Sequence, residues 1–138
     1  MTEKEINRYF EVAKQVSKLS DFQNRRKINI GAILVYKKRI VSIGFNSLKT
    51  NPIQDKLNSY RDFYPKPFPT IHAEVNCILH CKEKINWNKA KLFIYREHGK
   101  TSNPILAAPC EACRYLLKEK GIKDIYYTIN NGYVYEKL

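Results

Sequence analysis

Two short segments of the chain, H-A-E and P-C-E-A-C, carry residue types that can bind and use a metal ion. One imidazole and two thiolates give a zinc ion three protein ligands and leave its fourth position open, as in catalytic rather than structural zinc sites. We therefore expect His72, Cys110 and Cys113 to bind one catalytic Zn²⁺. Glu74 adds a carboxylate that can lie beside the metal without being a ligand.

An open zinc position supports hydrolytic chemistry. Zinc lowers the pKa of a bound water from about 15.7 towards about 7, so hydroxide becomes available at neutral pH. Glu74 would take the water proton and deliver it to the substrate, as a general base and acid. The combined pattern H-x-E … P-C-x-x-C is the signature of zinc-dependent nucleobase deaminases, in which C4 of cytosine or C6 of adenine is attacked. The two segments thus predict deamination with release of ammonia.

The remaining cysteines and histidines leave two alternatives open. The first is that His72 is an ordinary histidine and the C-x-x-C pair is structural. The second is a closed four-thiolate zinc site made by Cys77, Cys81, Cys110 and Cys113, which would leave the H-x-E motif unexplained. We expect Cys77 and Cys81 to be small buried apolar residues instead. The other two histidines, at positions 80 and 98, have no further candidate metal ligands at a spacing that is typical of a metal site.

The chain has 138 residues and 43% hydrophobic content, which suits one domain over 1–138 with its own core. No apolar run is long enough to span a membrane, and the first residues do not form a secretory signal. We therefore expect an intracellular, cytoplasmic protein, in which the four cysteines serve a metal rather than disulfides. An oligomer is compatible with the sequence.

The composition is strongly basic, with 25 Lys and Arg against 13 Asp and Glu and a formal charge of +12. Such an excess attracts polyanions and phosphates, although the Lys, Asn and Ile content also fits an AT-rich genome. Two basic runs stand out, Arg25-Arg26-Lys27 and Lys37-Lys38-Arg39. The segment between Asn46 and Thr70 adds aromatic residues, Tyr60, Phe63, Tyr64 and Phe68, which either stack on bases or cover the core.

The pattern of apolar residues predicts how the metal-binding segments are positioned. We expect helices over 3–19, 72–84 and 110–120, strands over 28–36, 39–45, 91–96, 122–128 and 133–135, and loops over 20–27, 46–70 and 97–108. This order predicts an α/β fold with three layers, α-β-α. Its five-stranded mixed sheet would end in an antiparallel hairpin, because the short turn at Asn130-Asn131-Gly132 cannot join parallel strands.

Both metal-binding segments fall where a loop enters a helix. Cys110 and Cys113 are three residues apart and share one helix face. The positive end of a helix and its free N–H groups lower the pKa of a thiol and favour the thiolate. His72, at the start of the other helix, would complete the ligand set.

These motifs resemble the cytidine deaminase superfamily over about residues 5–135. Gly44-Phe45-Asn46 is similar to the Gly-x-Asn of deoxycytidylate and tRNA adenosine deaminases, which implies that Asn46 contacts the sugar; the alternative is that it caps the strand end. The H-A-E-V-N run at 72–76 resembles the H-A-E-x-N of deoxycytidylate deaminases and implies a backbone contact from Ala73 to the base. Asn76 would help to hold the site.

The end of the chain resembles other branches of the superfamily. Nucleoside-type cytidine deaminases and several bacterial deaminase toxins end in an antiparallel pair of strands, whereas deoxycytidylate deaminases end in parallel strands. The small, Tyr- and Lys-rich chain also has a loose likeness to phage-encoded deaminases. The substrate of neither branch can therefore be carried over whole.

The resemblance favours cytosine over adenine, and the charge slightly favours cytosine in single-stranded DNA or RNA. Arg25 and Arg26 would contact the backbone of the strand, and Tyr64 and Phe68 would stack on its bases. The alternative is a free nucleotide such as dCMP, since one phosphate also needs a Lys or Arg. A zinc-stabilised nucleic-acid-binding module without activity is a further hypothesis, but it has no use for Glu74.

Overall fold

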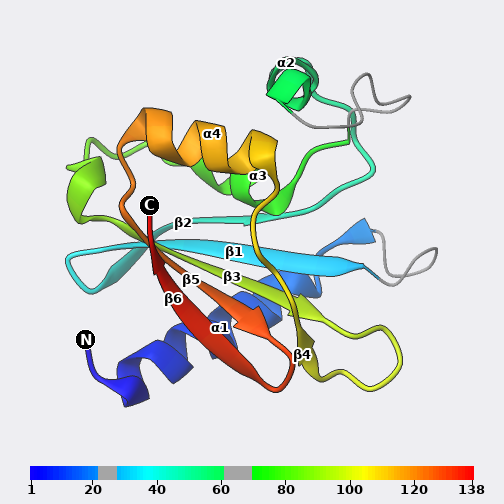
Figure 1. The fold of residues 1–138 in the computed structure, drawn as a ribbon, viewed down its shortest axis with the longest axis vertical. Helices are drawn as coiled ribbons and strands as arrows, with labels where there is room; N and C mark the ends of the chain where they lie inside the picture. The colour runs from blue at the N-terminus through cyan, green and yellow to red at the C-terminus, as the bar shows by residue number, and fades with distance from the viewer. Residues whose placement is uncertain (22–27, 61–69) are drawn as a thin grey trace.

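A mixed β-sheet lies at the centre of the computed structural model, which describes residues 1–21, 28–60 and 70–138 (Figure 1). The strand order is β2-β1-β3-β5-β6, and a short strand, β4, pairs with β3 off this path. The strands are β1 (Asn29–Tyr36), β2 (Arg39–Phe45), β3 (Lys91–Glu97), β4 (Pro104–Ile105), β5 (Asp124–Ile129) and β6 (Gly132–Lys137). Only β3 and β5 are parallel among these pairs. The mixed sheet and its final hairpin confirm the predicted fold class; β4 was not predicted.

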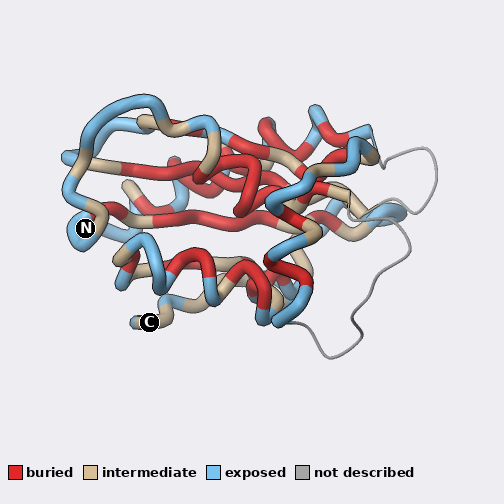
Figure 2. Tube along the Cα trace, turned by 90° about the horizontal axis from the view of Figure 1, so that it is seen from above, coloured by how far each residue is buried: buried red, intermediate tan, exposed pale blue. Residues whose placement is uncertain are grey.

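Helices cover both faces of the sheet. Helix α1 (Glu3–Ser17) packs on one face, and α3 (Ala73–Leu79) and α4 (Glu111–Lys120) pack on the other. The buried residues (red in Figure 2) follow the central strands and the inward faces of the helices. They form one core cluster with residues of α1 and another with residues of α3 and α4. This arrangement is the predicted three-layer structure. None of the described helices is long and apolar enough to cross a membrane.

Local sequence signals explain where α1 begins and how closely it packs. Thr2 and Glu5 form a capping box at its start, which satisfies N–H groups that have no partner within the helix. A Cβ on Gly31 would lie 2.3 Å from the carbonyl oxygen of Ala13, so only glycine lets the helix approach β1 this closely. The helix ends at Ser17, earlier than predicted, and Leu19 is exposed.

The hairpin between β1 and β2 has a turn that the sequence does not favour. Lys37 and Lys38 both have positive φ, 51° and 62°, as in the primed turns whose twist matches that of a two-stranded hairpin. Lysine is not among the residue types that favour such turns. The long antiparallel register of β1 and β2 imposes this backbone on them. In the last hairpin Asn131, with φ 59°, takes the positive φ that its residue type tolerates.

The segment predicted as a loop over 46–70 contains a helix, so that prediction was wrong in part. Helix α2 (Pro52–Leu57) is followed by a 3₁₀ turn, η2 (Asn58–Tyr60). Asn51 caps α2 by accepting hydrogen bonds from the N–H groups of Ile53 and Gln54, and Pro52 occupies a first-turn position where it needs no N–H partner. This Asn-Pro pair was the available signal, but the helix has too few residues to show a period.

Other boundaries shift by a few residues. Helix α3 ends at Leu79 rather than at 84, β5 begins at Asp124 rather than at 122, and β6 extends beyond the predicted range of 133–135. Helix α4 ends at Lys120, as predicted, and Gly121 follows it with a φ of 97°, the left-handed cap that glycine favours. The core of each element was therefore predicted correctly.

Candidate metal centre

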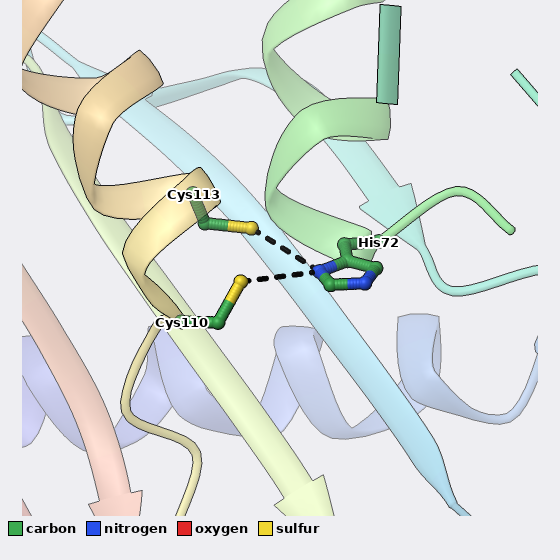
Figure 3. A group of neighbouring side chains, drawn as sticks. All are labelled: His72, Cys110 and Cys113. Atoms are coloured by element: carbon green, nitrogen blue, oxygen red, sulfur yellow. Dashed lines mark hydrogen bonds between the residues drawn. The ribbon is translucent and has the colours of Figure 1, made fainter. Parts of the chain in front are cut away.

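His72, Cys110 and Cys113 come together where helices α3 and α4 begin, as Figure 3 shows. The Nδ1 atom of His72 lies 3.5 Å from Sγ of Cys110 and 3.4 Å from Sγ of Cys113. Tetrahedral zinc, with Zn–S near 2.3 Å and Zn–N near 2.0 Å, requires N···S separations of about 3.5 Å. All ligand atoms of the group lie within 4.8 Å of one another. The three side chains therefore fit a single zinc ion bound through Nδ1 and two sulfurs.

Two helix starts hold these ligands in place. His72 is the N-cap residue of α3, Cys110 is the N-cap residue of α4, and Cys113 lies in the first turn of α4. Neither side chain caps its own helix; Nδ1 of His72 and Sγ of Cys110 instead lie 3.5 Å apart at the metal position. The positive ends of both helices point to the metal position and favour thiolates there.

The thiols of the pair have opposite pKa shifts. A hydrogen bond from Cys113 and the neighbouring His72 lower the pKa of Cys110 to about 3, although burial opposes this. The same hydrogen bond, together with burial, raises the pKa of Cys113 well above its usual value. Zinc binds thiolates, so metal binding displaces any proton from these sulfurs.

Glu74 lies in the first turn of α3, next to the ligands. Its side chain is buried, with a relative exposure of 5%. Burial raises the pKa of Glu74, while the charge of His72 and a hydrogen bond from Cys113 oppose the rise. Because Glu74 is not a member of the three-residue metal group, its carboxylate is a neighbour of the metal position.

The closed four-thiolate site is wrong. Among the described residues, the group that can hold a metal is His72, Cys110 and Cys113, and neither Cys77 nor Cys81 belongs to it. Cys77 is fully buried, as predicted, and burial raises the pKa of its thiol. Cys81 is only half-buried, so the prediction of burial was incorrect for this residue.

Comparison with known proteins agrees with this geometry. The sequence model for the cytidine and deoxycytidylate deaminase zinc-binding region matches residues 3–129. The chain belongs to this family. A comparison with curated protein sequences finds no match.

Solved structures of deaminases have the same fold as this family member. The dCMP deaminase from the cyanophage S-TIM5 in complex with dCMP and dUMP is 22% identical with a TM-score of 0.61, over 92% of this chain and 82% of that chain. The cytidine deaminase from Burkholderia pseudomallei is 18% identical with a TM-score of 0.61, over 99% and 93%. A bifunctional deaminase/reductase from Thermotoga maritima is 21% identical with a TM-score of 0.53, but 29% of its chain is covered.

A buried amide, which the sequence did not reveal, supports the histidine of this zinc site. Gln54 of α2 is fully buried, and its Oε1 accepts a hydrogen bond of 3.0 Å from the backbone N–H of His72. Its Nε2 donates to Oδ1 of Asn58 at 2.8 Å. Helix α2 therefore fixes the backbone from which the imidazole extends. No sequence signal marks Gln54, because its role depends on a short helix that was read as a loop.

Replacing Gln54 with Leu would leave the His72 N–H without this partner. We expect zinc affinity to fall about 10- to 100-fold, as for other groups that orient a metal ligand. The free energy of unfolding should fall by about 1–3 kcal/mol, the cost of one unsatisfied buried donor. Competition with a chelator measures the affinity, and Gln15→Leu, at an exposed position of α1, is the control. An unchanged zinc Kd would show that Gln54 does not position His72.

Asn46 and Asn76 are both buried at the end of β2. Asn46 accepts a hydrogen bond from the N–H of Ile30 at 3.0 Å and donates to the carbonyl of Ile28 at 2.7 Å. These bonds fit the alternative that Asn46 caps the strand end, and its contact with a sugar stays a prediction. Asn76 donates to the carbonyl of Phe45 at 2.9 Å, which joins α3 to β2. Gly44 allows this contact, because a Cβ there would lie 2.2 Å from the N atom of Cys77.

The residues predicted to bind a nucleic-acid strand are not all placed. Arg25, Arg26, Tyr64 and Phe68 lie outside the described residues. Tyr60 stacks on Tyr115 of α4, with ring centroids 3.8 Å apart, and both rings are exposed; stacking on bases stays a prediction. Ala73 is fully buried beside the ligands, where a backbone contact to a base stays a prediction.

The basic run Lys37-Lys38-Arg39 lies away from the zinc site. It forms the turn at the far end of β1, whereas Asn46 and the metal ligands lie where β1 begins. Arg39 also makes a two-point ion pair with Glu83. These residues therefore do not line the catalytic end of the sheet.

Arg96, at the end of β3, was not singled out from the sequence. Leu92 and Ile94, which share its side of the strand, belong to the core under α3 and α4. The residue is half-buried, and its buried Nε has no hydrogen-bond partner among the described residues. Arg96 pairs with Ile30, the residue whose N–H binds Asn46. The side chain therefore leaves a donor unused on the face and at the end of the sheet that carry the metal ligands.

Proposed function

We propose that this protein is a zinc-dependent hydrolase that converts the cytosine of a cytidine or deoxycytidine mononucleotide to uracil and releases ammonia. The observation that carries this proposal is the buried carboxylate of Glu74 beside three metal ligands. Three ligands leave one zinc position open, and a neighbouring carboxylate that is not a ligand can move protons.

The chain's own residues supply the proton transfers. A zinc ion, when bound, is the Lewis acid that makes a water molecule nucleophilic at neutral pH. Glu74 accepts the proton of the water that attacks C4 and delivers it to N3 of the ring. It then transfers the second proton of the water to the amino group, which leaves as ammonia when the C4–N bond breaks. Water and cytosine give uracil and ammonia, so atoms and protons balance.

Backbone and amide groups orient the ring and sugar in this proposal. The backbone of Ala73, next to the metal ligand His72, contacts the base. Asn46 contacts the sugar through its side-chain amide. Its Oδ1 accepts one hydrogen bond from the N–H of Ile30 and has a second lone pair that can accept another. Both assignments come from the resemblance of the G-x-N and H-A-E motifs and are supported by the positions of these residues at the zinc end of the sheet.

Two observations favour a mononucleotide over a nucleic-acid strand. The basic run at 37–39 lies at the opposite end of the sheet from the metal ligands, so it provides no groove for a strand at the zinc. The half-buried Arg96 on this side of the sheet offers a guanidinium for one phosphate group, because Arg binds phosphate oxygens in a planar fork. The dCMP deaminase of similar fold was solved in complex with dCMP and dUMP, which supports the same substrate class.

The net charge of +12 favours a second candidate, cytosine in single-stranded nucleic acid. A direct comparison of the zinc-loaded protein on dCMP, deoxycytidine and a cytosine-containing oligonucleotide separates the two. We expect conversion of dCMP with the highest kcat/KM and no uracil in the oligonucleotide. Uracil in the oligonucleotide, without conversion of dCMP, would contradict the mononucleotide proposal.

Arg96→Gln tests the assignment of the phosphate. We expect KM for dCMP to rise about 10- to 100-fold, the equivalent of one charge-assisted hydrogen bond, with little change in kcat. The kcat/KM for deoxycytidine, which has no phosphate, should stay within about twofold, because this substrate never used the interaction. Lys100→Gln, which removes an exposed charge beyond β3, is the matched control. An equal loss on both substrates would show that Arg96 supports the fold and not the phosphate.

A further inference from the structure

Most of the excess positive charge of the described residues lies at one end of the sheet. The undescribed ranges 22–27 and 61–69 hold five of the 25 basic and one of the 13 acidic residues, so the described chain has an excess of eight. The end where β1 and β6 finish and β2, β3 and β5 start carries eleven basic and four acidic side chains, an excess of seven. We call it the basic end.

Three connected regions build the basic end, on the left of Figure 1. The turn between β1 and β2 carries Lys37, Lys38 and Arg39. The connection from α3 to β3 carries Lys82, Lys84, Lys89 and Lys91. Val35, one residue before Tyr36 at the end of β1, pairs with Lys91 at the start of β3, which joins the first two regions across neighbouring strands.

The third region is the end of α4 with the strand ends below it, and it carries Lys118, Lys120, Lys123 and Lys137. The Nζ of Lys120 lies 5.5 Å from the centre of the Trp87 ring, so this region contacts the connection from α3 to β3. Apart from Lys91, which is half-buried, all the cations of the basic end are exposed. They therefore form one continuous, solvent-facing surface.

Three of the four acidic residues at this end already have partners, and one of these partners, Arg39, belongs to the basic end itself. Glu83 pairs with Arg39, Glu136 pairs with Arg114, and Asp124 accepts a hydrogen bond from Tyr135. Glu119 is the fourth acid. The first turn of α1 lies beside the turn at 37–38 and adds Glu3, Lys4 and Glu5, with Glu5 4.0 Å from Lys38. Counting this turn lowers the excess to six, which is still most of the described total.

The basic end is remote from the zinc site. Helices α3 and α4 both begin at the metal ligands and run towards the basic end. The 7 and 10 residues of these two helices span about 10 and 15 Å at the usual rise of a helix. These lengths exceed the Debye length of about 8 Å at physiological salt, so the lysines of the basic end contribute little to the binding of a nucleotide at the zinc.

We propose that the basic end binds the phosphodiester backbone of nucleic acid, at a surface separate from the zinc site and without reading bases. Exposed lysines contact phosphates as point charges, and such contacts provide sequence-independent binding through the release of counterions. The five strand ends span about 20 Å at the usual strand spacing, enough to face several consecutive phosphates. Binding here is independent of the substrate that the zinc site accepts.

A nucleic acid suits this surface better than a membrane does. Proteins that lie on a membrane insert aromatic and aliphatic side chains between their basic residues. At the basic end Trp87 is half-buried beneath Lys120, and Ile40 is exposed by only 37%. The surface thus offers charge with little apolar area.

Fluorescence anisotropy with a labelled thymidine oligonucleotide of about 20 nucleotides tests the proposal. This length exceeds the binding site of one small domain. The probe contains no cytosine, so the protein cannot deaminate it. The zinc-loaded protein should bind it at least about 100-fold more weakly at about 200 mM than at about 50 mM salt. In the fourfold variant Lys82→Gln, Lys84→Gln, Lys89→Gln and Lys123→Gln, we expect a further loss of about 10-fold or more. These side chains are exposed and lie outside the catalytic machinery, so dCMP turnover should not change.

A control variant with the same loss of charge replaces Lys14, Lys49, Lys56 and Lys100 with Gln, all outside the basic end. We expect its affinity for the oligonucleotide to stay within about threefold of the wild type, because long-range charge alone contributes little at this salt. Equal losses in the two variants, or a loss in the control only, would overturn the proposal. So would binding to vesicles with phosphatidylserine in the absence of binding to the oligonucleotide. A loss of oligonucleotide binding with unchanged dCMP turnover confirms it.

Discussion

Replacing Glu74 with Gln should lower kcat for cytosine deamination by at least about 10³-fold, while zinc content and fold stay the same. General acid–base catalysis by one side chain contributes about 10²–10⁴-fold to the rate. We expect a loss in the upper part of this range because Glu74 acts in more than one proton transfer. Gln keeps the shape of the buried side chain, so packing is preserved. The substitution also removes a buried carboxylate whose pKa is raised by burial, so stability should not decrease.

Glu111→Gln is the matched control for this experiment. Glu111 lies in the first turn of α4, as Glu74 lies in the first turn of α3, but it is exposed. Steady-state kinetics, zinc content by mass spectrometry and thermal unfolding should be measured on both variants. Turnover of Glu74→Gln close to that of the wild type would exclude Glu74 as the proton carrier. Loss of zinc from this variant would instead make it a metal ligand.

The second large effect is expected for Cys110→Ser, which should reduce bound zinc from about one ion per chain to less than about one tenth after dialysis. Zinc binds the thiolate far better than a serine hydroxyl, and the remaining two ligands of the group are too few for a stable site. Activity should fall with the metal. The free energy of unfolding of the zinc-loaded protein should also fall, because binding to the folded state stabilises it.

Cys81→Ser provides the control, since Cys81 is half-buried and outside the metal group. This variant should keep stoichiometric zinc and full activity. Full zinc in Cys110→Ser would exclude the ligand assignment, and loss of zinc from Cys81→Ser would restore the four-thiolate alternative.

The sequence was sufficient for the parts of the site that depend on local order. His72 and Cys110 were predicted at the start of two helices, and both are N-cap residues, because a loop that enters a helix leaves a recognisable pattern. The final hairpin was predicted from the short turn at 130–132, since chain geometry allows no other connection. Zinc binding by a member of this family follows from the same residues.

The features of the site that were not predicted depend on contacts between segments far apart in the chain. Gln54 acts on His72 across 18 positions, through a helix that is too short to be read from periodicity. The alternative for Asn46, a strand-end cap, could be evaluated only once Ile28 and Ile30 were placed beside it. Arg96 gains its position from the register with Ile30, which one-dimensional patterns do not contain.

The positions of the charged residues in the fold also could not be predicted from the sequence alone. The excess of Lys and Arg was interpreted as a groove for a substrate strand at the zinc, but composition does not say where charges gather. The run at 37–39 lies at the opposite end of the sheet, together with lysines from the ends of α4 and β6. The fold thus separates the charge from the catalytic end, which is why we assign them to different ligands.

Hydrolytic deamination incorporates one oxygen atom of water into the product. Protein with one bound zinc is incubated with dCMP in water enriched in ¹⁸O, and the product is analysed by mass spectrometry together with the ammonia released. Hydrolysis at C4 predicts dUMP that carries one ¹⁸O from the solvent, with one ammonia for each dUMP, and no product from Glu74→Gln on the same time scale. If the zinc-loaded protein forms no uracil from dCMP, from deoxycytidine or from a cytosine-containing oligonucleotide, the assignment of this site as a cytosine deaminase is contradicted.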